Sequence, residues 1–128
     1  MSFDVIPTND QTWLSCGGLH YADQQMFHEA MGDLIRLRGI PAKIVHGAAC
    51  GADSMAIGWA IHYAITCIGM PADWKKHGRA AGPIRNQEML DKHAPHMIIA
   101  FPGGRGTADM VSRARKAGID LAEIKPTD

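Results

Sequence analysis

A short apolar run that leads into a cluster of glycines, and then into a helix-forming segment, constrains this chain most. Residues 97–100 read Met-Ile-Ile-Ala and continue into Phe-Pro-Gly-Gly-Arg-Gly-Thr at 101–107. The apolar run fits a buried strand, and a helix is expected to open at Thr107 and Asp109. Glycines expose backbone N–H groups above the strand end, and the helix adds its positive N-terminal dipole. This pattern predicts an anion site reinforced by Arg105, although such glycines can also serve only a tight turn.

The order of strand, turn and helix recurs along the whole chain. We expect strands at residues 12–16, 43–46, 66–70, 97–101 and 119–124. We expect helices at about residues 23–38, 53–64, 83–92 and 107–116, with a loop or lid at 71–82. This alternation predicts an α/β fold, a single compact Rossmann-like three-layer domain with a mostly parallel sheet of about five strands and helices on both faces. Residues 1–11 are expected to form an N-terminal arm, and residues 12–128 the domain.

The composition limits the classes of partner. Thirteen basic residues balance thirteen acidic ones, which argues against a general nucleic-acid coat or a binder of anionic membranes. No apolar run approaches the roughly 20 residues of a membrane span and the first ten residues lack a signal pattern, so we expect a cytoplasmic protein. Cys16, Cys50 and Cys67 include no C-x-x-C pair, which favours reduced thiols. The histidines form no cluster with carboxylates, so no metal site is predicted.

The turns that follow parallel strands should converge at one edge of the sheet, because right-handed crossovers send them all there. Ligands of open parallel sheets bind in that crevice, so we expect a guest of nucleotide size. The candidate ligand contacts are Gly17, Gly18, Gly47, Ala48, Asp53, Ser54, Asp73, Trp74, Arg79, Arg85, Asn86, Pro102, Gly103, Gly104, Arg105, Gly106 and Thr107.

Several of these candidates also have a structural explanation. Asp53 can cap the helix that follows it, contact a ligand, or accept from a ribose hydroxyl. Trp74 can stack on a base or close the domain over helix ends. Arg85 is expected to contact a phosphate or a catalytic site with Asn86 as its polar partner. The alternative for Arg85 is a helix-surface ion pair with Glu88.

Four ordered segments of the chain resemble one protein family. They read HGAACGADS at 46–54, PADW at 71–74, GRAAGPIRN at 78–86 and PGGRGT at 102–107. Together they resemble the YspA/cpYpsA-related branch of the SLOG superfamily, which groups the DNA-processing protein DprA/Smf with the LOG phosphoribohydrolases. The resemblance runs from about residue 13 to 119. It implies a Rossmann-like domain that binds nucleotides or nucleotide-derived ligands at its glycine loops.

The resemblance also bears on catalysis. In LOG enzymes the related loop holds the phosphate of a nucleoside monophosphate while the base–ribose bond is hydrolysed. Those enzymes carry a glutamate three residues after the threonine and an arginine on a preceding helix. Here Met110 occupies the glutamate position, Asp109 is the nearest carboxylate, and Arg85 is the counterpart of the arginine. Relatives of this branch read Gly-Gly-Arg in the first loop, where this chain has Gly-Gly-Leu at 17–19.

From these observations we expect the chain to bind a nucleoside monophosphate, ADP-ribose or an NAD-derived ligand, to need no cofactor and to form a homo-oligomer. One alternative is N-glycosidic hydrolysis of such a ligand, with Asp109, Asp53 or Asp73 as the carboxylate and Arg85 beside it. A second alternative is a DprA-like module for single-stranded DNA. The neutral net charge and the small number of aromatic residues argue against that module, so nucleic acid is not expected as a partner.

Overall fold

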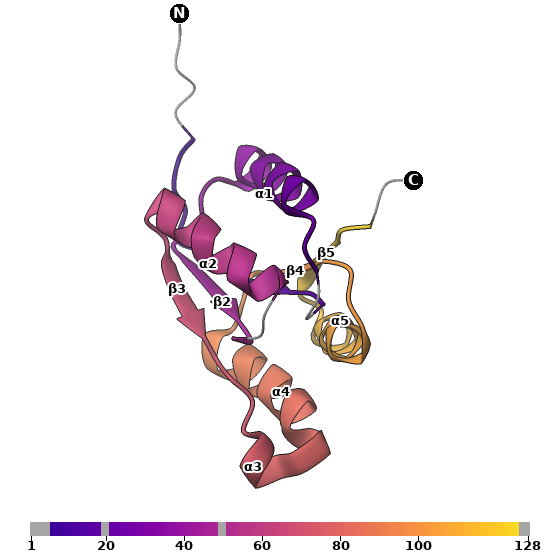
Figure 1. The fold of residues 1–128 in the computed structure, drawn as a ribbon. Helices are drawn as coiled ribbons and strands as arrows, with labels where there is room; N and C mark the ends of the chain where they lie inside the picture. The colour runs from indigo at the N-terminus through magenta and orange to yellow at the C-terminus, as the bar shows by residue number, and fades with distance from the viewer. Residues whose placement is uncertain (1–5, 19–20, 49–50, 126–128) are drawn as a thin grey trace, which may run out of the picture.

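The computed structural model describes residues 6–18, 21–48 and 51–125 (Figure 1). The longest described helix has 15 residues, and no helix in this part of the chain combines the length and apolar character needed to cross a membrane. In chain order the elements are β1 (Thr12–Cys16), α1 (Gln24–Arg38), β2 (Lys43–His46), α2 (Ala52–Tyr63), β3 (Thr66–Gly69), α3 (Trp74–His77), the 3₁₀ turn η1 (Gly78–Ala80), α4 (Ala81–His93), β4 (Met97–Ala100), α5 (Arg105–Ala117) and β5 (Asp120–Glu123).

The strands form one parallel sheet in the order β3-β2-β1-β4-β5. β1 lies at its centre, where Trp13 is opposite Ile44 of β2 on one side and Met97 of β4 on the other. The predicted α/β architecture with a parallel sheet is therefore confirmed.

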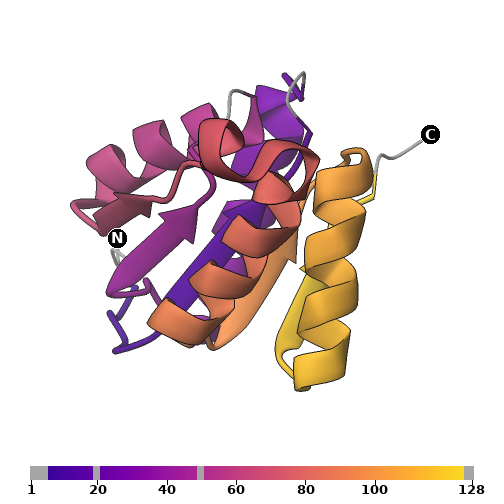
Figure 2. The same ribbon diagram turned by 90° about the horizontal axis from the view of Figure 1, so that it is seen from below.

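Helices cover both faces of this sheet (Figure 2). Alternate residues of β1 point to opposite faces, as the period of a strand requires. Trp13 packs with Phe27 of α1 and with Trp59 of α2, whose ring stacks on it at a centroid distance of 6.4 Å. Leu14 packs on the other face with Met89 of α4 and with α5. The three-layer order is thus α1 and α2, the sheet, and α4 and α5.

Local signals explain several of the helix ends. Asp23 caps α1 by accepting a hydrogen bond from the backbone N–H of Met26 at 3.0 Å. Gly118 ends α5 in the left-handed conformation that glycine adopts without strain. α2 and α4 end instead at Ala64 and Ala94, which take the same left-handed conformation despite their Cβ atoms.

Three helix starts differ from the prediction, and one of them is α4, which begins at Ala81 rather than at about residue 83. α2 begins at Ala52 with Gly51 as its N-cap residue, so Asp53 lies in the first turn and not at the cap. α5 begins at Arg105 with Gly104 as its N-cap residue, two residues before Thr107. A glycine cap has no side-chain oxygen, so neither start carries the Ser, Thr, Asp or Asn signal by which a cap is recognised in a sequence.

The prediction of a loop or lid at residues 71–82 is wrong. Most of this segment is helical, because it contains α3, η1 and the first residues of α4. Asp73 caps α3 by accepting from the backbone N–H of Lys76 at 3.0 Å. The segment is therefore a pair of short turns that continue into α4.

The described part of the predicted N-terminal arm is bonded to the segment between α1 and β2. Thr8 forms a parallel bridge with Ile40. The backbone N–H of Asn9 donates to the carbonyl of Ile40 at 2.9 Å, and Ile40 donates to the carbonyl of Pro7 at 2.8 Å. These bonds fix residues 7–9 against the domain.

Candidate functional site

A cavity of about 330 Å³ lies where the turns after β1, β2 and β4 meet the starts of α2, α3 and α5 and one side of α4. We call it the sheet-edge cavity. Strand-to-helix turns that are far apart in sequence thus meet at the carboxyl ends of the strands, where ligands of such sheets bind. The cavity is lined by Cys16, Gly17, Gly18, Gly47, Asp53, Trp74, Arg85, Asn86, Gly104, Arg105, Gly106 and Thr107.

The glycines of the first and last turns serve two different purposes. The backbone N–H of Gly18 donates to the carbonyl of Pro102 at 2.9 Å, so the two turns touch. A Cβ on Gly103 would lie 2.7 Å from the Gly18 nitrogen, which only glycine avoids. By contrast, a Cβ on Gly104 or Gly106 would meet no atom within 4 Å. Gly18 and Gly103 let the two turns pack together, whereas Gly104 and Gly106 leave the backbone of the last turn uncovered.

The N-terminal turn of α5 forms one wall of the cavity. Its first three residues, Arg105, Gly106 and Thr107, all line the cavity. The first backbone bond of the helix runs from Ala108 to the carbonyl of Gly104 at 3.0 Å, and N–H groups before this point have no acceptor within an α-helix. The cap residue makes no side-chain bond, and the aligned peptide dipoles make this end positive. This wall can bind an anion.

Arg85 reaches from α4 across the end of β2. Its Nη1 donates to the carbonyls of Gly47 at 2.6 Å and of Met70 at 3.3 Å, and its Nε donates to Oδ1 of Asn86 at 3.1 Å. A Cβ on Gly47 would lie 2.6 Å from Nη1, so a glycine is needed for this approach. Arg85 therefore bonds inward, to the edge of the sheet, and the surface pair with Glu88 is not among the ion pairs of the described residues.

Burial and, to a smaller extent, neighbouring charges shift the pKa values of several groups in and beside the cavity. Burial, with the negative charge of Asp53, raises the pKa of the Cys16 thiol to about 12, so this thiol stays protonated. Burial, with the positive charge of Arg85, lowers the pKa of His46, whose Nδ1 accepts from the backbone N–H of Ala48 at 2.9 Å. Burial also lowers the pKa of Arg85, and Asp53 opposes that shift. The cavity therefore combines a cationic guanidinium and a buried carboxylate with a neutral thiol.

Asp109 is on α5, and its side chain faces α4. Its Oδ2 accepts from Nε of Arg113 at 2.8 Å and from Nδ2 of Asn86 at 3.0 Å, and Asn86 also donates to the carbonyl of Gly106 at 3.1 Å. Burial alone would raise the pKa of Asp109, but the hydrogen bonds from Arg113 and Asn86 hold it below its usual value. Met110 is fully buried in the core between these helices and the sheet. Neither residue lines the sheet-edge cavity.

Trp74 stands at the mouth of the cavity. It is the first residue of α3, lines the cavity and is 61% exposed. Its Cη2 would lie 3.6 Å from a Cβ on Gly82, which shows that the tip of the ring rests on the start of α4. An exposed indole beside a helix start that can bind an anion is suited to stack on a planar group.

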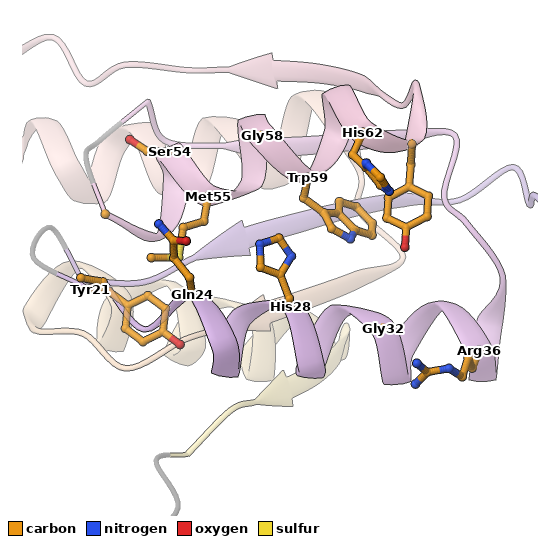
Figure 3. Close-up of a pocket in the computed structure, with 13 residues that line it drawn as sticks. Tyr21, Gln24, His28, Gly32, Arg36, Ser54, Met55, Gly58, Trp59 and His62 are labelled. Carbon is orange, nitrogen blue, oxygen red and sulfur yellow. The ribbon is translucent and has the colours of Figure 1, made fainter.

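Other predicted contacts lie outside the cavity. Asp73 caps α3, and Arg79 is exposed on η1. Ser54 lines a groove between α1 and α2, as Figure 3 shows. The predicted residues that do not line the sheet-edge cavity are Ala48, Ser54, Asp73, Arg79, Pro102, Gly103 and Asp109.

Cys16 is the lining residue that the sequence interpretation missed. It ends β1 and precedes the first glycine turn, so its position at the carboxyl end of a predicted strand could have identified it. Within residues 6–18, 21–48 and 51–125, no group of three or more His, Cys, Asp or Glu is placed to hold a metal ion.

Comparison with known proteins gives two matches. The sequence model of the YspA, cpYpsA-related SLOG family matches residues 14–77, which is half of the chain and runs from β1 to the end of α3. Gene 61 protein of Mycobacterium phage D29 is 35% identical over 115 residues, which cover 84% of this chain and 91% of that protein. No solved structure matches the chain significantly.

Proposed function

This chain belongs to the YspA, cpYpsA-related SLOG family, and from that premise we propose that its sheet-edge cavity binds a nucleotide or a nucleotide-derived ligand. Family membership supports a nucleotide-related ligand-binding or ligand-modifying role in general. The finer proposal is carried by one observation, the N-terminal turn of α5, which has no side-chain cap, is open at Gly104 and Gly106, and faces a cavity that contains a half-buried arginine.

In this proposal the phosphate lies against the start of α5. The backbone N–H groups of Arg105, Gly106 and Thr107 are the donors, and they act together with the helix dipole. The Arg105 guanidinium adds charge at the exposed side of the turn, and Arg85 adds charge from within the cavity. An anion is the ligand that satisfies these donors.

The remaining walls fit the sugar and the base. The Asp53 carboxylate lines the cavity and can accept from ribose hydroxyls. The exposed ring of Trp74 can stack on a base at the mouth. The cavity volume of about 330 Å³ lies at the lower end of the range for small-molecule sites, roughly 300–1,000 Å³. Among the expected ligands a nucleoside monophosphate suits this volume best, because ADP-ribose and NAD derivatives are larger.

Binding without hydrolysis is the better supported activity. Met110, at the position of the LOG glutamate, is fully buried in the core. The Asp109 carboxylate is held by Arg113 and Asn86 outside the cavity lining. Asp53 is the carboxylate that lines the cavity, so a hydrolytic alternative would depend on Asp53.

Isothermal titration of the purified chain with nucleoside monophosphates, ADP-ribose and NAD tests the proposal. Gly106→Glu places a negative charge in the phosphate position, and its side chain enters open space. We expect this variant to lose at least about tenfold in affinity, equivalent to about 1.4 kcal/mol. Ser112→Glu is the matched control, because it adds the same charge to an exposed position on the same helix and should bind nucleoside monophosphates like the wild type. Absence of binding by the wild type, or unchanged binding by Gly106→Glu, would contradict the proposal.

Chromatography of the same mixtures separates binding from hydrolysis. A bound ligand recovered intact supports binding alone. Release of free base by the wild type, with intact bound ligand in Asp53→Asn, would assign the hydrolytic alternative to Asp53.

A further inference from the structure

A second cavity, of about 480 Å³, lies at the same edge of the sheet. It is formed by the turn after β4, by one side of α5 and by the end of β5, and α5 and β5 run side by side (Figure 2). We call it the β5-side cavity. Gly104 and Thr107 line both this cavity and the sheet-edge cavity, so the two cavities adjoin at the first turn of α5.

The strand order explains why the two cavities adjoin. β1 and β4 are neighbours in the sheet, but the chain leaves them in opposite directions, toward β2 after β1 and toward β5 after β4. The sheet-edge cavity lies on the β2 side of this divide, and the β5-side cavity lies on the other side. Open parallel sheets bind two-part ligands across such a point, with the phosphates at a helix N-terminus. The first turn of α5 occupies the position that those phosphates need.

The charges that line the β5-side cavity favour a second anionic group. Arg115, Lys116 and Lys125 bring three positive charges, against one negative charge from Glu123. Arg115 pairs with Glu123 at 2.6 Å. Lys116 and Lys125 belong to none of the ion pairs that the described part of the chain contains. Two positive charges are therefore left to balance a phosphate.

The size of the β5-side cavity indicates what accompanies that phosphate. Its volume lies within the range of small-molecule sites, roughly 300–1,000 Å³, and is larger than a phosphate alone needs. Its lining includes Phe101 and Val111, apolar side chains that are 1% and 7% exposed. The pair with Arg115 uses Oε2 of Glu123, and a carboxylate has further capacity to accept from hydroxyl groups. An apolar floor with a carboxylate beside it suits a sugar ring.

We propose that the β5-side cavity is a second subsite for the ligand of the sheet-edge cavity, and that this ligand is a nucleoside diphosphate joined to a second sugar. This inference rests on the proposed function, which places the first phosphate at the start of α5. The second phosphate crosses Gly104, where a Cβ would meet no atom within 4 Å. The second sugar enters the β5-side cavity, and Lys116 and Lys125 balance the added charge. A nucleoside monophosphate occupies the sheet-edge cavity alone.

Isothermal titration with pairs of ligands that share a base tests the second subsite. The pairs are AMP with ADP-ribose, UMP with UDP-glucose, and GMP with GDP-mannose. In the pair whose base the wild type accepts, the sugar-linked member should bind about tenfold more tightly or better. Lys116→Glu and Lys125→Glu should each lower the affinity for the sugar-linked member about fivefold or more. Both variants should keep the affinity for the monophosphate, which also shows that they are folded.

Lys92→Glu is the matched control. Lys92 is exposed in the last turn of α4, as Lys116 is in the last turn of α5, and it lines neither cavity. This variant should bind both members like the wild type. If neither member of any pair binds, both proposals are wrong. If monophosphates bind but the second sugar adds no affinity, or if the added affinity survives Lys116→Glu and Lys125→Glu or is also lost in Lys92→Glu, the second subsite is wrong and the first stands.

Discussion

Two helix layers flank the sheet (Figure 2), and the contacts between the helices differ from one layer to the other. α4 and α5 are linked by hydrogen bonds between Asn86 and Asp109, between Arg113 and Asp109, and between Arg113 and Gln87 at 2.9 Å. α1 and α2 share buried apolar residues, but a groove of about 830 Å³ remains between them. The linked pair supplies most of the helical wall of the sheet-edge cavity. The hydrogen-bonded layer thus positions the candidate ligand site, while the other layer leaves an open groove between its two helices.

Met110→Glu should break the linked layer with the largest effect. Met110 is fully buried against Leu14, Val45 and Ile98, so the new carboxylate would have no polar partner in the core. We expect the free energy of unfolding to fall by about 4 kcal/mol or more, which is a large part of the stability of an ordinary domain. Urea unfolding followed by circular dichroism measures this loss.

The control for that substitution is again Ser112→Glu on the same helix. Ser112 is exposed, and a surface substitution of this kind changes stability by about 0.5 kcal/mol or less. If Met110→Glu unfolded at the same urea concentration as Ser112→Glu, position 110 would not belong to the core between α4 and the sheet.

Asp109→Asn should weaken the same layer in a pH-dependent way. Hydrogen bonds from Arg113 and Asn86 keep the pKa of Asp109 below its ordinary value of 3.8. A carboxylate with a lowered pKa in the folded state stabilises the fold above its unfolded pKa, and this stabilisation is lost as the pH falls through the folded pKa. The wild type should exceed Asp109→Asn in stability by about 1 to 2 kcal/mol at neutral pH. The difference should shrink below about pH 4.

Urea unfolding of both proteins from neutral to acidic pH measures that difference. A gap that stayed constant down to the lowest pH would show that the Asp109 carboxylate contributes no charge-dependent stability between α4 and α5.

Gly58→Ala should have the smallest effect and the opposite sign. Gly58 lies inside α2, and the added methyl group meets no atom within 4 Å. Replacing a helix-interior glycine by alanine should raise the stability of the single chain by about 0.5–1 kcal/mol. Urea unfolding of the wild type and of Gly58→Ala, at the same low protein concentration, measures this gain. A loss of stability would mean that the open layer is crowded at this point.

The sequence predicted the architecture because its strongest signals are local. Apolar runs bounded by glycine located β1 and β4, and Asp23 and Gly118 marked the ends of helices correctly. α3 was missed because four residues are too few for a helical period, although Asp73 is a residue type that commonly caps a helix and does so here.

The details of the candidate site depend on contacts between distant parts of the chain. Arg85 bonds to the carbonyl of Gly47, 38 residues away, and no local pattern contains that pairing. From the sequence we predicted that Gly47 contacts a ligand. In the structure Gly47 also makes room for the guanidinium of Arg85. Ser54 follows Asp53 directly, yet the rotation of α2 directs one residue to the cavity and the other to the groove between α1 and α2. Such differences arise only when helices are placed in three dimensions.

The central position of β1 has a consequence for how this chain is made. β1 lies between β2 and β4, and its pairing of Trp13 with Met97 spans most of the sequence. The bond from Gly18 to Pro102, which joins two walls of the sheet-edge cavity, spans the same interval. A nascent chain carries the first two glycine turns long before the ribosome has added β4 and α5. The sheet-edge cavity therefore cannot form during most of synthesis, and an incomplete product lacks the proposed ligand site.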